Sequence, residues 1–410
     1  MIKFIVILFA VLGELYSVFL KIVRYRSANN PIPANVSDLY DAETYQRWKN
    51  YSAEHCRIEI GFDIASFAVV LILLFTNAYS AFAALFPATS FAQLFSVILL
   101  MLIMDFLFDV PKSYIQTMII EEKYGFNRSS IKTFIKDMII HMIGNLIIVM
   151  GLVLIMKFLH ELTGDYLIVF FAVVIFFMTL LIAFLSPLLS RIGNKFVPLE
   201  DGELKDRLVA LLERHGYRVK AIQVMDASRR TTKMNAYFTG LGKMKKIVLY
   251  DTLLQNMTND EICAIFAHEM GHGLHKDIMK RQILNIGNLL ILSAAVYFTV
   301  KFSVFCTAFG FNGLNYAFVF LIVSIWLEVL QPLTNFVLFA NSRAAEYRAD
   351  QQAVIEGYGE AMISALKKLA RDNFAHLAPS KINILLEYTH PPIGERIDRI
   401  EQSNKKSSQK

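Results

Sequence analysis

The chain has 410 residues, of which 55% are hydrophobic, and its mean hydropathy is +0.45. Soluble chains of this length are usually less apolar, and the excess lies in long runs, so the composition predicts a polytopic membrane protein. A net charge of +6 agrees with basic cytosolic loops. The basic residues form no stripe with interleaved aromatic residues, which argues against a nucleic-acid partner. Three widely spaced cysteines, none in a CxxC pair, argue against a disulfide framework.

Seven stretches reach the roughly 20 apolar residues that a helix needs to cross a bilayer. They lie near residues 2–22, 60–86, 89–108, 137–158, 166–189, 285–309 and 314–339. The first carries Glu14 and lacks a small-residue cleavage site, so we expect a retained helix and not a signal peptide. The expected regions are residues 1–189 with five transmembrane helices, a polar domain at 190–284, two further membrane helices at 285–340, and a polar segment at 341–410.

The connections between these stretches differ in charge. Residues 21–59 and 109–136 contain six and five Lys or Arg residues, whereas the connections near 87–88, 159–165 and 310–313 contain none. The positive-inside rule therefore predicts an N-terminus outside the cytosol and a cytosolic C-terminus. Both polar regions then fall on the cytosolic side.

The polar region 190–284 has the pattern of a small α+β domain. Leucines on one face predict a helix over residues 203–214 that ends at Gly216. Residues 221–226 read as a strand, and residues 233–240 and 245–254 read as a hairpin around Gly240 and Gly242. A further helix is expected from Thr258 or Asn259 to Asp277. The C-terminal residues 403–410 are expected to be disordered.

The last of these helices carries the segment FAHEMGHGLHKD. His268 and His272 are four residues apart, so their imidazoles project from one face and can bind one zinc ion. Glu269, next to the first histidine, is in the position of the general base in an HExxH site. Gly271 allows another backbone or the metal to approach closely.

A catalytic zinc site needs a third protein ligand and an open position. The segment NSRAAEYRAD follows the last apolar stretch, and if that helix continues, Glu346 and Asp350 share a face at i and i+4. One carboxylate can ligate while the other orients a ligand histidine. We predict Glu346 as the ligand and Asp350 as the orienting group. Spacing alone leaves open that both are solvated acids near Arg343 and Arg348.

Three blocks, HEMGH, NSRAAEYRAD and YTHPPIGER, resemble the signature of the Ste24-type integral-membrane zinc metalloproteases, the type I CAAX prenyl proteases of peptidase family M48. The resemblance extends to residues 121–130, 185–200 and 234–254. It implies an all-α polytopic membrane protein, with seven transmembrane helices in a barrel around a water-filled chamber and a cytosolic α+β metalloprotease domain. It also implies one Zn²⁺ per chain, bound by His268, His272 and Glu346, with Glu269 as the base.

The same resemblance assigns roles to two further segments. Residues Asn235, Ala236, Tyr237 and Phe238 resemble the family's substrate-binding edge strand, to which an extended peptide can add through main-chain hydrogen bonds. His390 matches a late histidine that is a candidate donor to the oxyanion. His275 could compete as a ligand, but the resemblance favours Glu346.

The expected function is zinc-dependent cleavage of peptide or protein substrates, prenylated in the CAAX type, within the lipid bilayer. The chain is compact, which is more typical of a prokaryotic member, so the location is a bacterial inner membrane or, in a eukaryote, the endoplasmic reticulum. Alternatives are an HtpX-like quality-control protease, a site-2-type intramembrane protease, a non-catalytic zinc-bound channel or clearance factor, and a transporter. Glu269 argues against the non-catalytic channel, because a pure binding protein needs no base.

Overall fold

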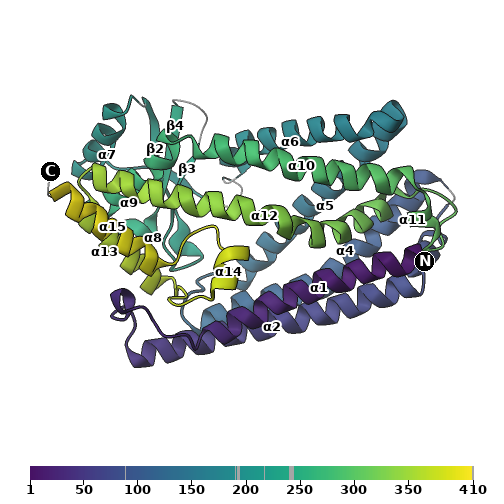
Figure 1. Ribbon diagram of the computed structural model, residues 1–410, viewed down its shortest axis with the longest axis horizontal. Helices are drawn as coiled ribbons and strands as arrows, with labels where there is room; N and C mark the ends of the chain where they lie inside the picture. The colour runs from purple at the N-terminus through teal and green to yellow at the C-terminus, as the bar shows by residue number, and fades with distance from the viewer. Residues whose placement is uncertain (88, 190, 192–193, 217, 240–243, 409–410) are drawn as a thin grey trace.

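Long helices run side by side along the longest axis of the molecule, and a small sheet with shorter helices gathers at one end (Figure 1). The computed structural model describes residues 1–410 except 88, 190, 192–193, 217, 240–243 and 409–410. The long apolar helices are α1 (Ile2–Ser27), α2 (Ala42–Phe75), α4 (Ser90–Tyr114), α5 (Ile131–Thr163), α6 (Leu167–Leu189), α10 (Asp277–Lys301) and α12 (Tyr316–Ile355). The N-terminus lies at the end opposite to the sheet and the C-terminus.

Six stretches of the described chain are long and apolar enough to cross a membrane. One of them, Ile131–Ile182, contains α5 and most of α6, which a 3₁₀ turn, η3 (Gly164–Tyr166), joins. The prediction of a polytopic helical membrane protein is therefore confirmed, and each of the seven predicted stretches overlaps one long helix.

Two predicted boundaries were wrong. The second helix begins at Ala42 and ends at Phe75, because Asn77 adopts a left-handed conformation with φ 58° and a separate short helix, α3 (Ala78–Ala83), follows. The sixth helix begins at Asp277, directly after the left-handed Lys276, and ends at Lys301. A short helix, α11 (Val304–Thr307), covers part of the remainder. Both long helices extend beyond their apolar stretches through polar residues, which hydropathy does not detect.

Helix α12 belongs to both parts of the molecule. Its first half buries apolar side chains such as Phe318 and Ile322 among the membrane helices. Its second half is polar in composition, yet Ala345, Glu346 and Asp350 are buried against the sheet-bearing end. Helix α12 thus extends from the apolar helices into the polar domain, where its second half holds the two buried acids.

The polar domain contains a four-stranded sheet with the order β1-β2-β4-β3. The strands are β1 (Phe196–Pro198), β2 (Arg218–Met225), β3 (Ala236–Thr239) and β4 (Met244–Tyr250). Strands β3 and β4 are antiparallel, as predicted for the hairpin, and β3 lies at the edge of the sheet. The predicted turn at Gly240 and Gly242 lies outside the described residues.

Three helices accompany the sheet: α7 (Glu203–Arg214), α8 (Asp251–Asn256) and α9 (Asn259–Leu274). Helix α7 buries Leu208, Leu211 and Leu212, which confirms its predicted apolar face. Helix α9 begins with a capping box, in which the Thr258 hydroxyl accepts from the Glu261 N–H and the Glu261 carboxylate accepts from the Thr258 N–H. This cap fixes where α9 starts and therefore which of its residues face inward.

The C-terminal segment forms α13 (Gly359–Asp372), α14 (Lys381–Leu386) and α15 (Ile393–Ser408). The prediction of disorder over residues 403–410 was wrong through Ser408, because α15 is amphipathic and buries Ile397 and Ile400. The remaining short elements are η1 (Ala34–Val36), η2 (Ile115–Glu121), a π-helical stretch, and η4 (Ala227–Arg229).

Candidate metal centre

Helices α9 and α12 pack closely at a glycine, and this contact brings the predicted metal ligands together. A Cβ atom added to Gly271 would lie 2.9 Å from the Cα of Ala349 and 3.0 Å from the Cβ of Gln352. Only glycine fits such a backbone approach without a shift of one helix. The glycine next to the second histidine therefore sets the distance between the two helices, as expected for Gly271.

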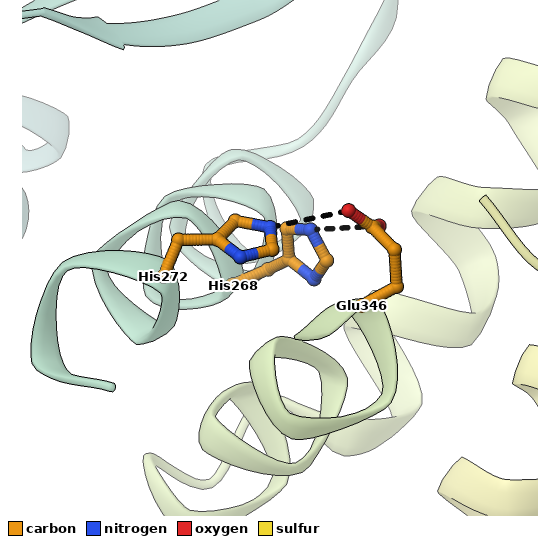
Figure 2. Close-up of side chains that lie close together, drawn as sticks. All are labelled: His268, His272 and Glu346. Atoms are coloured by element: carbon orange, nitrogen blue, oxygen red, sulfur yellow. Dashed lines mark ion pairs between the residues drawn. The ribbon is translucent and has the colours of Figure 1, made fainter. Parts of the chain in front are cut away.

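The side chains of His268, His272 and Glu346 point toward one another from these two helices (Figure 2). The His268 Nε2 lies 3.4 Å from Glu346 Oε2, and the His272 Nε2 lies 3.3 Å from Glu346 Oε1. Ligand atoms at the usual zinc distances, in a tetrahedral arrangement, are about 3.3 Å apart. One ligand atom from each residue lies within 4.8 Å of the others.

The donor set has an unsatisfied atom that a cation would satisfy. Glu346 is 4% exposed, and its Oε2 is buried without a hydrogen bond among the described residues. Nitrogens of His268 and of Arg396 each lie 3.4 Å from this oxygen. Two neutral imidazoles and one carboxylate are ligands that Zn²⁺ prefers, so these residues fit a zinc ion.

Each histidine is oriented by its own aspartate. The His268 Nδ1 hydrogen-bonds Asp350 Oδ1 at 2.9 Å, and the His272 Nδ1 hydrogen-bonds Asp277 Oδ2 at 3.2 Å. A carboxylate beside Nδ1 holds the proton there and leaves the Nε2 lone pair for a metal. The structure thus places Asp350 where the sequence predicts an orienting group. It adds Asp277, for which the sequence predicted no role in the site.

Two arginines hold the two aspartates in turn. Arg396 donates from Nε to Asp350 Oδ2 at 2.9 Å and from Nη2 to Asp350 Oδ1 at 2.6 Å. Arg348 donates from Nη2 to Asp277 Oδ1 at 2.7 Å. Each imidazole is therefore the end of an arginine–aspartate–histidine chain. The feature that could have identified Asp277 from the sequence is its position five residues after His272, where a new helix begins.

The pKa values of His268 and Glu269, both on α9, are raised for different reasons. Burial disfavours the charged form of His268, but hydrogen bonds to Asp350 and Glu346 outweigh it and raise its pKa to about 9 in the metal-free site. Burial raises the pKa of the Glu269 carboxyl, and the neighbouring histidines oppose this only in part. Glu269 makes no hydrogen bond or ion pair with the described residues, so its carboxylate is available to a substrate water.

A cavity of about 660 Å³ opens next to these residues. Its lining includes Glu269, His272, Glu346, His390 and, from β3, Tyr237. The His390 Nε2 lies 3.4 Å from Glu346 Oε1, so the ring faces the ligand set. Its Nδ1 lies 2.9 Å from the hydroxyl of Thr389.

The predicted substrate strand is only partly directed at this cavity. Tyr237 lines it, whereas Asn235 is exposed and its side-chain oxygen accepts from the Ala236 N–H at 2.9 Å. The backbone of β3 pairs with β4 from Ala236 to Thr239 and leaves its other edge without a partner strand among the described residues. The side chain of Phe238 lies outside what the structure describes.

Comparison with known proteins agrees with this arrangement. The chain matches Peptidase family M48 over residues 198–404 and the CAAX prenyl protease N-terminal family, five membrane helices, over residues 21–191. It is 30% identical to CAAX prenyl protease 1 of Saccharomyces cerevisiae, over 92% of this chain and 89% of that protein. It is 33% identical to the CAAX prenyl protease 1 homolog of Arabidopsis thaliana, over 73% of this chain and 71% of that protein.

The fold is also that of a solved structure. The crystal structure of S. mikatae Ste24p superposes with a TM-score of 0.90 at 27% identity, and the match covers 98% of this chain and 99% of that one. The family match spans half of the chain, and the yeast relative spans nearly all of it. The chain therefore belongs to peptidase family M48, as a multi-pass membrane metalloprotease of the Ste24 type.

Proposed function

We propose that the protein is a zinc-dependent endopeptidase that cleaves a peptide beside His268, His272 and Glu346. The observation that carries the proposal is the paired arrangement of the ligands: both Nε2 atoms face one carboxylate, while both Nδ1 atoms are held by aspartates. One zinc ion per chain, when bound by these three residues, supplies a Lewis acid that polarises the substrate carbonyl and lowers the pKa of water.

The chain's own groups perform the proton transfers. Glu269 takes the proton of the attacking water on its carboxylate and passes it to the nitrogen of the leaving amine. The raised pKa of this carboxyl favours the first step, because it makes the carboxylate a stronger base. His390 faces the same cavity and donates a hydrogen bond to the carbonyl oxygen as negative charge develops there. Asp350 keeps His268 in the required tautomer.

The edge strand β3 provides a binding surface for an extended substrate. Its free edge offers main-chain groups from Ala236 to Thr239, to which a peptide can add as a further strand. Tyr237, on this strand, lines the cavity. We expect Asn235, Ala236, Tyr237 and Phe238 to contact the substrate in this way.

The relatives indicate the substrate class. Their names describe CAAX prenyl proteases, and the overall match to them supports prenylated C-terminal CAAX peptides as substrates of this chain. An HtpX-like quality-control activity is the alternative within the same family. A non-catalytic channel is disfavoured, since Glu269 lines the cavity and has no hydrogen-bond or ion-pair partner among the described residues.

The match to Ste24p also suggests how the helices are arranged in the membrane. We propose that the seven long helices form a barrel around a chamber, with the metal site facing inward; the overall match to Ste24p supports this. The opposite positions of the two termini agree with an N-terminus outside and a C-terminus in the cytosol (Figure 1). We retain the division into residues 1–189, 190–284, 285–340 and 341–410, and a bacterial inner membrane or endoplasmic reticulum location.

The test combines metal content with cleavage. Purified protein and its Glu269→Gln variant are assayed for bound zinc and for cleavage of a farnesylated CAAX peptide and its unprenylated counterpart. We expect one zinc in each protein and cleavage by the unmodified chain alone. Preference for the farnesylated peptide supports CAAX processing, and equal cleavage supports quality control. Zinc without cleavage of either peptide contradicts the enzyme proposal.

A further inference from the structure

The cavity beside the metal ligands contains one cation that the proposed chemistry does not use. Arg281 lines it from α10, together with Gln282 and Asn285. Among the residues that the structure describes, Arg281 makes no ion pair and no side-chain hydrogen bond. It is also solvent-exposed. Its neighbour one turn earlier, Asp277, already accepts from His272 and Arg348 and needs no further cation.

Arg281 lies in a cavity whose lining also includes several acidic side chains. Three carboxylates line the cavity, those of Glu269, Asp277 and Glu346. An anionic end of a substrate would be repelled by them unless a positive group received it at a distance from the ligands. Arginine suits this task, because its fork of N–H donors matches a carboxylate at both oxygens.

The position of Arg281 agrees with the length of a short C-terminal peptide. Asp277 contacts the ligand His272 at 3.2 Å, and Arg281 follows Asp277 by four residues on the same face of α10. Arg281 lies about 5.4 Å further along the axis of α10 than Asp277, and its long side chain brings the reach to the order of 10 Å, the length of about three extended residues. In a CAAX terminus, three residues separate the cysteine from the terminal carboxylate.

We propose that Arg281 binds the free C-terminal carboxylate of the substrate, and that this contact selects peptides whose cleavable bond lies three residues from the end. Asn285, one turn further along α10, lies beside it and offers a second donor. Arg281 is thus a specificity-determining residue for the substrate class of the proposed function, on which this inference rests. It takes no part in bond breaking.

Binding to a catalytically inactive protein tests the proposal independently of cleavage. The full chain carrying Glu269→Gln is loaded with zinc, and fluorescence anisotropy gives the Kd of a farnesylated CAAX peptide as the free acid and as the C-terminal carboxamide. We expect the carboxamide to bind about ten- to a hundredfold more weakly, the range for loss of a charged hydrogen-bonded pair. Adding Arg281→Gln weakens the free acid to the level of the carboxamide and leaves the carboxamide unchanged.

Two further variants serve as controls. Arg281→Lys keeps the charge but not the fork, so it retains part of the discrimination between acid and carboxamide. Arg128→Gln makes the same chemical change at an exposed position outside the cavity, and it retains all of the discrimination. Equal Kd values for the two peptides in the Glu269→Gln protein, or an unchanged ratio after Arg281→Gln, overturn the proposal. Discrimination in binding without cleavage by the unmodified chain overturns only the enzyme proposal.

Discussion

At the scale of single residues, the candidate metal site depends on the groups that orient the histidines as much as on the histidines themselves. The two arginine–aspartate–histidine chains are similar in geometry but differ in burial. Asp350 is 1% exposed and Arg396 is 6% exposed. Arg348, in the other chain, keeps about a third of its side chain in solvent. A substitution in the Arg396–Asp350–His268 chain should therefore cost more free energy than one in the Arg348–Asp277–His272 chain. A buried charge that loses its partner is strongly destabilising.

Removing one carboxylate charge should weaken zinc binding in proportion to this burial. We expect Asp277→Asn and Asp350→Asn each to lower zinc affinity by about 10- to 100-fold, the usual range for groups behind a metal ligand. The larger loss is expected for Asp350→Asn, which also leaves the charge of Arg396 buried without its partner. Competition with a fluorescent chelator measures both affinities. Asp165→Asn, at the far end of the membrane helices, is the control. Equal affinity in all three variants would contradict the assigned roles.

Zinc binding should also release a proton. The pKa of His268 in the metal-free site is about 9, above its ordinary 6.5, so at neutral pH zinc displaces a proton from this ring. Zinc affinity therefore rises with pH and levels off above about pH 9. Titration calorimetry at pH 7.5 in two buffers of different ionisation enthalpy measures the protons released. A heat of binding that does not depend on the buffer would show that His268 is already neutral.

At the scale of elements, the site depends on one crossing of two helices. Helix α9 carries His268, His272 and Glu269, the two proposed ligands and the proposed base, and α12 carries Glu346 and Asp350. Their separation is set at Gly271, where the backbone of Ala349 is too close for a side chain. A small change in this separation moves Glu346 relative to both histidines.

Gly271→Ala should therefore disturb the site although alanine favours a helix. We expect a loss of about 1–3 kcal/mol in stability from overpacking, which exceeds the roughly 1 kcal/mol that alanine gains over glycine inside a helix. Zinc affinity should fall with it. Gly287→Ala on α10 is the matched control, because a Cβ atom there meets nothing within 4 Å. Thermal unfolding with and without zinc compares the two; a stabilised Gly271→Ala protein would refute the argument.

At the scale of the whole molecule, the C-terminal segment ties the polar end to the first two helices. The ring of His376 lies 4.8 Å from that of Trp48 on α2, and its Nε2 lies 2.8 Å from the Ser27 hydroxyl on α1. The Trp48 indole donates to the carbonyl of Phe374. These contacts hold the segment between α13 and α14 against the ends of α1 and α2.

The contact of His376 with α1 and α2 should weaken at acidic pH. Burial, with a smaller effect from Arg24, lowers the pKa of His376 to about 4. The unfolded chain therefore binds a proton at higher pH than the folded chain, and stability falls as the pH drops from about 6.5 toward 4. Between pH 7.5 and 5 the loss from this group is about 2 kcal/mol, at roughly 1.4 kcal/mol per pKa unit.

The variant His376→Gln tests the acid effect. It should be less stable than the unmodified chain at pH 7.5 but should lose less of its thermal midpoint between pH 7.5 and 5. His141→Gln, on α5 and away from the contact of His376 with Trp48 and Ser27, is the matched control. The same pH slope for His376→Gln and the unmodified chain would place the titrating group elsewhere.

Much of the molecule could be read from the sequence, because its signals are local. Apolar runs located the long helices, the HExxH spacing located α9, and the i and i+4 spacing of Glu346 and Asp350 holds on a continuous α12. The end of α2 at Phe75 and the start of α10 at Asp277 were missed, since left-handed residues and polar helical turns carry no hydropathy signal. The helix over residues 403–408 was missed because its composition is polar.

The sequence by itself determined the class of protein, its order of elements, and the residue types able to bind zinc and to act as a base. Only the tertiary structure decided which carboxylate lies beside which histidine, that Arg348 and Arg396 complete the chains, and that Arg281 has no ion-pair partner in the part of the chain that the structure describes. Periodicity and motif spacing act along one helix, and they report which residues share a face. Contacts between α9, α10 and α12 join residues far apart in the chain, and no local pattern encodes their distances.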